Sequence, residues 1–182
     1  MSNVRLSIEL VPDTAAGSNL RLAVMDGVRF PWEPIRKATT HAAGMRCEVC
    51  GGVGPTHPVE CHEQWEYVVE NGRHVQRLAG FVALCPACHG VKHYGLSQLR
   101  EGRGDLPVGS TRAHLRDVNG WTDDDVTEYV ADRFGEYDER SRHEWWWDLT
   151  ILSSYGIGPE WARVFAPSDR PTPPYDFAKW RG

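Results

Sequence analysis

Four of the five cysteines form two pairs, Cys47 with Cys50 and Cys85 with Cys88, and each pair is separated by two residues. This spacing lets both sulfur atoms of a pair reach one ion from a tight turn. Two such pairs supply the four thiolates of a tetrahedral zinc site. We therefore predict a structural Zn²⁺ ion, with buried thiols or a redox pair as the alternatives. A histidine placed directly after Cys88 points to a second function at the same place.

The segments around these pairs predict a hairpin and a helix. Val59 to His62 is typical of a short strand, Asn71-Gly72 of a turn, and residues 75–84 of a second strand that leads to Cys85. A helix is expected from Cys88 to about Leu99. Together these elements form a β-β-α unit with zinc at its base.

The flanking segments carry their own signals. Residues 4–11 alternate apolar and polar side chains, which predicts a strand, and residues 31–43 predict a helix that ends at Gly44. Beyond the centre, we expect helices over 110–118 and 123–143, a final strand over 145–151 and an irregular tail over 167–174. Thr122 and Asp125 have the spacing of a capping box at the start of the second of these helices.

The chain has 182 residues, of which 41 % are hydrophobic and 25 % are charged, so it can bury a real core. We predict an α+β fold in which zinc reinforces that core. The predicted organisation is an N-terminal extension over 1–44 (strand, loop, helix), a zinc-stapled core over 45–103, and a helical C-terminal extension over 104–182.

The net charge is −5, and most of the acidity lies in residues 104–182, with nine basic against fifteen acidic side chains. This balance argues against coating nucleic acid by bulk charge, and it makes the C-terminal extension a candidate surface for a protein partner. No apolar run has the length of a membrane span or a secretory signal, so we expect a cytoplasmic protein without a membrane partner.

The central segment resembles the HNH endonucleases, also called ββα-metal or His-Me finger nucleases. The resemblance spans about residues 45–95 and rests on Cys47-x2-Cys50, Val59-Glu60-Cys61-His62, Leu84-Cys85-Pro86-x-Cys88-His89 and Lys92-His93. The flanks are similar to those of bacterial HNH nucleases whose activity is uncharacterised, through Ile8-Glu9-Leu10-Val11-Pro12, Glu60-Cys61-His62-Glu63, Val118-Asn119-Gly120-Trp121 and Arg142-His143-Glu144-Trp145.

The resemblance implies a hydrolase that cleaves phosphodiester bonds in DNA, most simply double-stranded DNA. His62 matches the family's general base, and a neutral imidazole is suited to take a proton from water. His89 matches its metal ligand, and His93, four residues on, shares the same helix face. Mg²⁺ or another divalent ion held there would stabilise the leaving 3′ oxygen. Each histidine also has a purely structural alternative. His62 is then a packed or surface residue, and His89 caps the helix or forms a hydrogen bond to a zinc-bound thiolate.

The chain departs from the family at two positions. Where the family carries a metal-binding Asp or His before the base, this chain has Cys61, which prefers softer ions than Mg²⁺ and is equally well explained as a small buried hydrophobe. Glu60, on the same strand face as His62, and the neighbouring Glu63 are candidate replacements. Gly80 stands where the family has the asparagine that holds the base in place.

Basic residues around the predicted site are candidate phosphate contacts: Arg73, Arg77, Lys92, Arg100 and Arg103. Solvated surface positions are the alternative for each of them. Two functions therefore stay open from the sequence, a metal-dependent endonuclease and a non-catalytic zinc module that binds nucleic acid or a protein.

Overall fold

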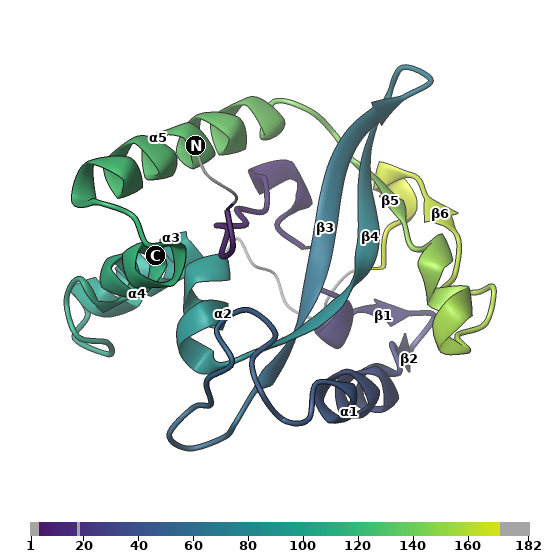
Figure 1. Cartoon of the computed structure of the whole chain (residues 1–182). Coiled ribbons are helices and arrows are strands. Elements are labelled where there is room, and N and C mark those ends of the chain that lie inside the picture. The colour runs from purple at the N-terminus through teal and green to yellow at the C-terminus, as the bar shows by residue number, and fades with distance from the viewer. Residues whose placement is uncertain (1–3, 18, 172–182) are drawn as a thin grey trace. The chain divides into compact units, whose positions relative to one another are not determined.

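The computed structural model describes residues 4–17 and 19–171 and has a mixed α+β fold (Figure 1). The elements, with η marking 3-10 helices, are η1 (Asp13–Ala15), η2 (Leu20–Leu22), β1 (Val24–Met25), β2 (Val28–Arg29), α1 (Trp32–Ala42), β3 (Glu60–Glu70), β4 (Arg73–Leu84), α2 (Pro86–Lys92), α3 (Tyr94–Gly102), α4 (Ser110–Asn119), α5 (Asp123–Arg140), β5 (Trp146–Asp148), η3 (Thr150–Tyr155), β6 (Val164–Phe165) and η4 (Pro167–Asp169). The α+β class predicted from the sequence is confirmed. The predicted tail begins at η4 and, from residue 172, lies outside the described residues.

The chain divides into two compact units that are each built from separate stretches of sequence. The first unit contains the described residues of Met1–Leu10 together with Ala38–His62 and Val82–Asp138. The second unit contains the described residues of Val11–Lys37, Glu63–Phe81 and Glu139–Gly182. The predicted three-part organisation along the sequence stays a prediction.

A long hairpin of β3 and β4 is the main strand pair (Figure 1). Its turn is Asn71-Gly72, with φ of 51° and 74°, and two central residues with positive φ match the right-handed twist of a hairpin. The predicted hairpin is confirmed. The paired ends of the strands, Glu60–His62 and Val82–Leu84, belong to the first unit.

The second unit extends this sheet in the order β3-β4-β5-β6. β5 runs parallel to β4, with Val75 opposite Trp146, and β6 pairs antiparallel with β5. Trp147 is fully buried, and its Nε1 donates a hydrogen bond of 2.7 Å to Gln76 Oε1. Trp147 is therefore a core residue. The strand predicted over 145–151 is confirmed in its first half, as β5.

Residues 4–11 do not form the predicted strand. Leu6 and Ile8 are buried as the alternation requires, but side chains satisfy their backbone N–H groups. Asn119 Oδ1 accepts from Leu6 N at 3.1 Å, and Tyr129 Oη accepts from Ile8 N at 3.2 Å. The alternating pattern correctly predicted which side chains are buried. It does not predict a strand by itself, because a strand also requires hydrogen bonds to a neighbouring backbone.

Four helices complete the first unit around a shared apolar core, in which Cys88, Val91, Leu115 and Val126 are fully buried. The single helix predicted over 88–99 is instead two, because His93 leaves helical geometry with φ −95° and ψ 48°. The predicted boundaries of α1, α4 and α5 agree with the structure within a few residues.

The capping box at the start of α5 is also present. Asp125 Oδ2 accepts from Thr122 N at 2.8 Å, and Asp125 N donates to Thr122 Oγ1 at 3.2 Å. Within residues 4–17 and 19–171, no helix combines the length and apolar character needed to cross a bilayer.

Candidate metal centres

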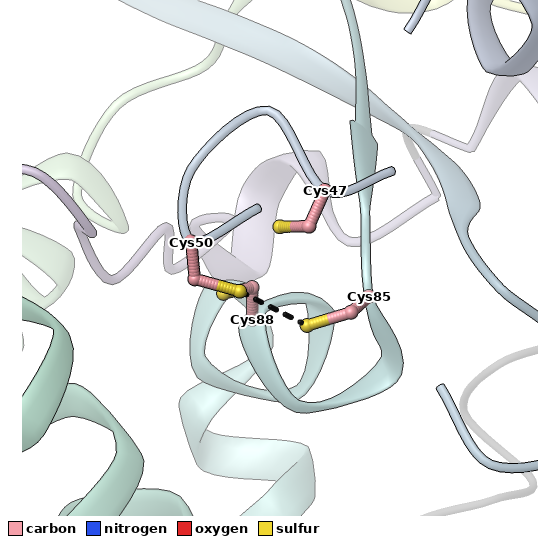
Figure 2. Close-up of side chains that lie close together, drawn as sticks. All are labelled: Cys47, Cys50, Cys85 and Cys88. Carbon is pink, nitrogen blue, oxygen red and sulfur yellow. Dashed lines mark hydrogen bonds between the residues drawn. The ribbon is translucent and has the colours of Figure 1, made fainter. Parts of the chain in front are cut away.

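The four paired cysteines converge in the first unit (Figure 2). Their sulfur atoms all lie within 4.8 Å of one another, and Cys50 Sγ is 3.6 Å from Cys85 Sγ. Zinc–sulfur bonds of about 2.3 Å in a tetrahedron place neighbouring sulfur atoms about 3.8 Å apart. A disulfide would need about 2.05 Å, and all the cysteines are free thiols. The cluster has the ligands and the spacing for a metal ion such as Zn²⁺.

Glycines shape the first pair. Gly51 has φ 74°, the left-handed region that closes the turn after Cys50. A Cβ atom on Gly52 would lie 3.3 Å from Cys50 Sγ, and the Gly52 N–H donates to that sulfur at 3.4 Å. A side chain at position 52 would therefore crowd the sulfur that this N–H supports.

Glu48 attaches the first pair to the end of β4. Its backbone N–H donates to Ala83 O at 2.9 Å, and its Oε2 accepts from Ala83 N at 2.6 Å. Cys85 follows β4 directly and is the N-cap of α2, with Pro86 at the first helical position and Cys88 within the first turn. The two pairs are thus held together by the backbone as well as by any ion.

The pKa values of the cysteines differ within the cluster. Burial raises the pKa of the Cys88 thiol, and negative charge on Cys47 and Cys85 raises it further. Burial also acts to raise the pKa of Cys47, but backbone hydrogen bonds, the largest from Cys50 and Cys85, lower it to about 7. Four sulfur atoms this close repel one another when they are deprotonated, and a bound cation would reduce that repulsion.

His114, on α4, contacts this cluster from outside the four cysteines. Its Nε2 lies 3.1 Å from Cys88 Sγ. An imidazole N–H at this distance is suited to donate a hydrogen bond to a metal-bound thiolate, where it would offset part of the negative charge.

A second cluster in the first unit brings together His62, His89 and His93, with one ring nitrogen of each within 4.8 Å of the others. His62 comes from β3, His89 from α2, and His93 from the break between α2 and α3. His89 Nε2 and His93 Nε2 are 3.2 Å apart. Two imidazole nitrogens bound to one tetrahedral Zn²⁺ at about 2.05 Å would be about 3.3 Å apart.

Two carboxylates contact ring nitrogens of this cluster. Glu9 Oε2 lies 2.9 Å from His62 Nε2, and Glu60 Oε2 contacts His89 Nδ1. An ionised carboxylate only accepts hydrogen bonds, so each contacted ring nitrogen carries a proton, and in a neutral imidazole the other nitrogen keeps its lone pair. His62 is only 3 % exposed, and its Nδ1 has no hydrogen-bond partner among the described residues.

The electrostatics favour charged carboxylates beside these rings and a neutral His93. The hydrogen bond with His89 is the largest effect on the pKa of Glu60. Burial acts to raise this pKa, but His89 together with His57 lowers it to about 2. Burial would raise the pKa of Glu9, but His62 and the positive charge of Lys92 lower it. Burial, followed by the neighbouring His62 and His89, lowers the pKa of His93 to about 3. His93 is therefore neutral near pH 7, as a metal ligand must be.

Of the other predicted ligands, Glu60 contacts the histidine cluster as a partner of His89. Cys61 is buried and belongs to neither metal-ligand cluster of the described residues. Glu63 belongs to the second unit, where its Oε1 accepts from Leu20 N at 3.2 Å. Gly80 is buried with φ of 157°, a conformation in which an asparagine would be strained.

The predicted phosphate contacts occupy different settings. Lys92 is buried, and its Nζ contacts Glu9 Oε1 at 2.5 Å and Ser7 Oγ at 2.8 Å. Arg77 pairs with Glu70 and Asp148 in the second unit. The Arg73 guanidinium lies 4.3 Å from the centre of the Trp146 ring. Arg100 and Arg103 are exposed at the end of α3 and just after it.

Sequence reasoning missed Glu9, His57 and His114 as parts of these centres. His57 Nε2 lies 2.6 Å from Glu60 Oε1, and its nearness in sequence was the available signal. Glu9 is an acidic residue in a segment of alternating apolar residues, which is a weak signal of a special role. The sequence does not show its partner, because His62 is distant in sequence. Nothing in the spacing of His114 indicated its contact with Cys88.

Comparisons with protein-family models, with curated proteins and with solved structures each give no match. The geometry of the two clusters is therefore the basis for a functional proposal.

Proposed function

We propose that the chain is a metal-dependent endonuclease of the HNH, or ββα-metal, type that hydrolyses phosphodiester bonds in DNA. The observation that carries the proposal is the unpartnered Nδ1 of buried His62 in a cluster with His89 and His93. An unpaired buried polar atom is costly unless a ligand or substrate engages it. The hairpin followed directly by α2, with a four-cysteine cluster at their junction, supports the same proposal.

His62 is assigned the role of general base. Glu9 accepts from its Nε2–H, so Nδ1 holds the lone pair that takes a proton from water. The oxygen of that water forms a bond to phosphorus as the bond from phosphorus to the 3′ oxygen breaks. The leaving oxygen then acquires a proton from solvent.

His89 and His93 are assigned to the divalent ion through their Nε2 atoms, which lie 3.2 Å apart. The ion, when bound, supplies positive charge to the phosphate and to the leaving oxygen. Nitrogen ligands favour Mn²⁺, Ni²⁺ or Zn²⁺ over Mg²⁺, which prefers oxygen and water. The side chain of His89 is 24 % exposed and that of Glu60 is 34 % exposed, so the cluster has a route to solvent.

The test is cleavage of supercoiled plasmid by the zinc-loaded protein with added Mg²⁺, Mn²⁺ or Ni²⁺. We expect nicking, and we expect His62→Ala to lower its rate by about 10² to 10⁴, the usual contribution of a general base. His41→Ala is the matched control, because His41 is exposed on α1. Absence of cleavage with every metal, or equal loss in both variants, would contradict the proposal.

The second candidate is a zinc module that binds nucleic acid or a protein without turnover. Gly80 favours it, because its backbone conformation disfavours the family's asparagine at this position. This function predicts DNA binding that requires the exposed Arg100 and Arg103 and is unchanged by His62→Ala. Binding without cleavage in the plasmid experiment would support it over the endonuclease.

A further inference from the structure

We propose that Glu9 is a positioning residue for His62 and that residues 5–9 form part of the catalytic centre. This inference rests on the proposed nuclease function, in which His62 is the base. The carboxylate of Glu9 fixes the imidazole so that the Nε2 proton points at Glu9 and the Nδ1 lone pair is left for water. Glu9 contacts His62 in the fold, but in the sequence it lies well before the hairpin and helix that carry His62, His89 and His93.

The contact has the geometry of a carboxylate–histidine pair. Glu9 Oε2 is 2.9 Å from His62 Nε2, and the His62 side chain is 4 % exposed. Water therefore competes little for this hydrogen bond. A buried imidazole with one engaged nitrogen has its orientation and its tautomer defined together.

Lys92 holds Glu9 in this position through two separate contacts. The Glu9 backbone N–H donates to Lys92 O at 3.0 Å, and Lys92 Nζ contacts the second carboxylate oxygen at 2.5 Å. Ser7 Oγ accepts from the same ammonium group at 2.8 Å. Each oxygen of the Glu9 carboxylate thus has its own partner, which leaves the side chain little freedom to turn away from His62.

The rest of the segment is fastened to the first unit in the same manner. Ile8 N donates to Tyr129 Oη, and Leu6 N donates to Asn119 Oδ1. Leu6 is fully buried and Ile8 is 5 % exposed. These anchors hold the backbone on both sides of Ser7, so the position of Glu9 is set by the core and not by the His62 contact alone.

This arrangement supplies a function that Gly80 does not. The family's asparagine holds the base in place, and at position 80 this chain has no side chain to do so. Glu9 provides a charged acceptor in its place, and a hydrogen bond to a charged acceptor is stronger than one to a neutral group. Lys92 then has a role inside the centre, which replaces the phosphate contact expected from the sequence.

The experiment compares Glu9→Gln with the wild type in the full chain loaded with zinc, using plasmid nicking with Mn²⁺. We expect kcat to fall by about 10- to 100-fold, the usual effect of losing the partner of a functional histidine, with KM little changed. Glu128→Gln is the control, since Glu128 is an exposed carboxylate on α5 of the first unit. Equal kcat in Glu9→Gln and wild type would overturn the proposal.

A second measurement does not depend on turnover. In ¹⁵N-labelled zinc-loaded protein without added Mn²⁺, the His62 Nε2–H proton should give a protected NMR signal that is lost in Glu9→Ala. Persistence of that signal in Glu9→Ala would overturn the Glu9 role even if the nuclease is active. Loss of the signal in a chain that never cleaves DNA would sustain the Glu9–His62 pair and contradict only the nuclease.

Removing Glu9 alone leaves the buried Lys92 cation unpaired, which can unfold the protein. The double variant Glu9→Gln/Lys92→Met removes both charges and keeps similar side-chain volumes. We expect it to retain zinc and cooperative unfolding but to show the same loss of kcat. Wild-type kcat in this folded double variant would contradict the proposal.

Discussion

The cysteine cluster and the histidine cluster lie in the same unit, share α2, and differ in almost every other respect. Three of the four cysteines are buried, and the backbone and side chain of Glu48 both bond to Ala83, which holds the two turns together. The histidine cluster offers three nitrogens, two carboxylates behind them and partial exposure at His89. A complete set of protein ligands is typical of structural metal sites, whereas catalytic sites keep an open position. We therefore expect the cysteines to stabilise the fold, and we propose the histidines as the site of chemistry.

The largest expected effect follows from removing the sulfur ligands. Cys85→Ser/Cys88→Ser should abolish zinc binding and unfold the first unit, since structural zinc sites contribute on the order of 10 kcal/mol to folding. Zinc content and chemical denaturation followed by circular dichroism measure this effect. A double variant that unfolds cooperatively at the wild-type midpoint would contradict a structural role for the cysteine cluster.

The opposite pattern is expected for the histidine cluster. His93→Ala should retain zinc and the fold but lose binding of added Mn²⁺, and with it about 100-fold or more of the nicking rate. Calorimetric titration with Mn²⁺ and the plasmid assay check both parts, with His41→Ala as the control. Loss of zinc from His93→Ala would show that the two clusters are not separate in function.

A smaller effect is expected at the outer contact of the cysteine cluster. His114→Ala removes the ring 3.1 Å from Cys88 Sγ and should weaken zinc affinity by about 10- to 100-fold. Competition with a chromophoric chelator measures the affinity. The nicking rate at saturating zinc should be unchanged, and a lower rate under that condition would contradict the assignment of His114 to the cysteine side.

The smallest effect concerns the helix that carries His114. Burial acts to raise the pKa of Glu101, but hydrogen bonds from Thr111, Gly109 and Ser110 at the start of α4 lower it below its usual value. A lowered folded-state pKa stabilises the protein above the unfolded-state value, and this stability is lost as the pH falls through the folded-state value.

Glu101→Gln should therefore cost about 1 to 2 kcal/mol at pH 7, with a smaller difference from wild type below pH 4. Urea unfolding at both pH values measures the difference. A cost that grows as the pH falls would contradict the role assigned to the carboxylate, and neither metal cluster should lose its ion at pH 7.

The sequence predicted those features that depend on neighbouring residues. Asn71-Gly72 specified the hairpin turn, and Thr122 with Asp125 specified the start of α5, because both signals act within a few residues. The two cysteine pairs were found for the same reason. The alternation of residues 4–11 correctly indicated burial of Leu6 and Ile8 but not the absence of a strand partner.

Contacts between distant residues were not predictable in the same way. Glu9 and Lys92 are 83 residues apart in the sequence, and only the fold shows that they neutralise each other. The basic charge of Lys92 therefore suggested a phosphate contact. Gly80 likewise indicated only that the family's asparagine is missing. The contact between Glu9 and His62, which we propose takes over its role, depends on residues 53 positions apart.

The central claim is that the histidine cluster binds a second ion separate from the zinc of the cysteines. Anomalous diffraction from crystals of zinc-loaded protein soaked with Mn²⁺, recorded on both sides of the zinc and manganese absorption edges, tests it directly. We expect a zinc peak among Cys47, Cys50, Cys85 and Cys88 and a manganese peak bound by His89 and His93, next to His62. A zinc peak alone, with the histidines unaltered and bonded to one another at saturating Mn²⁺, would contradict it.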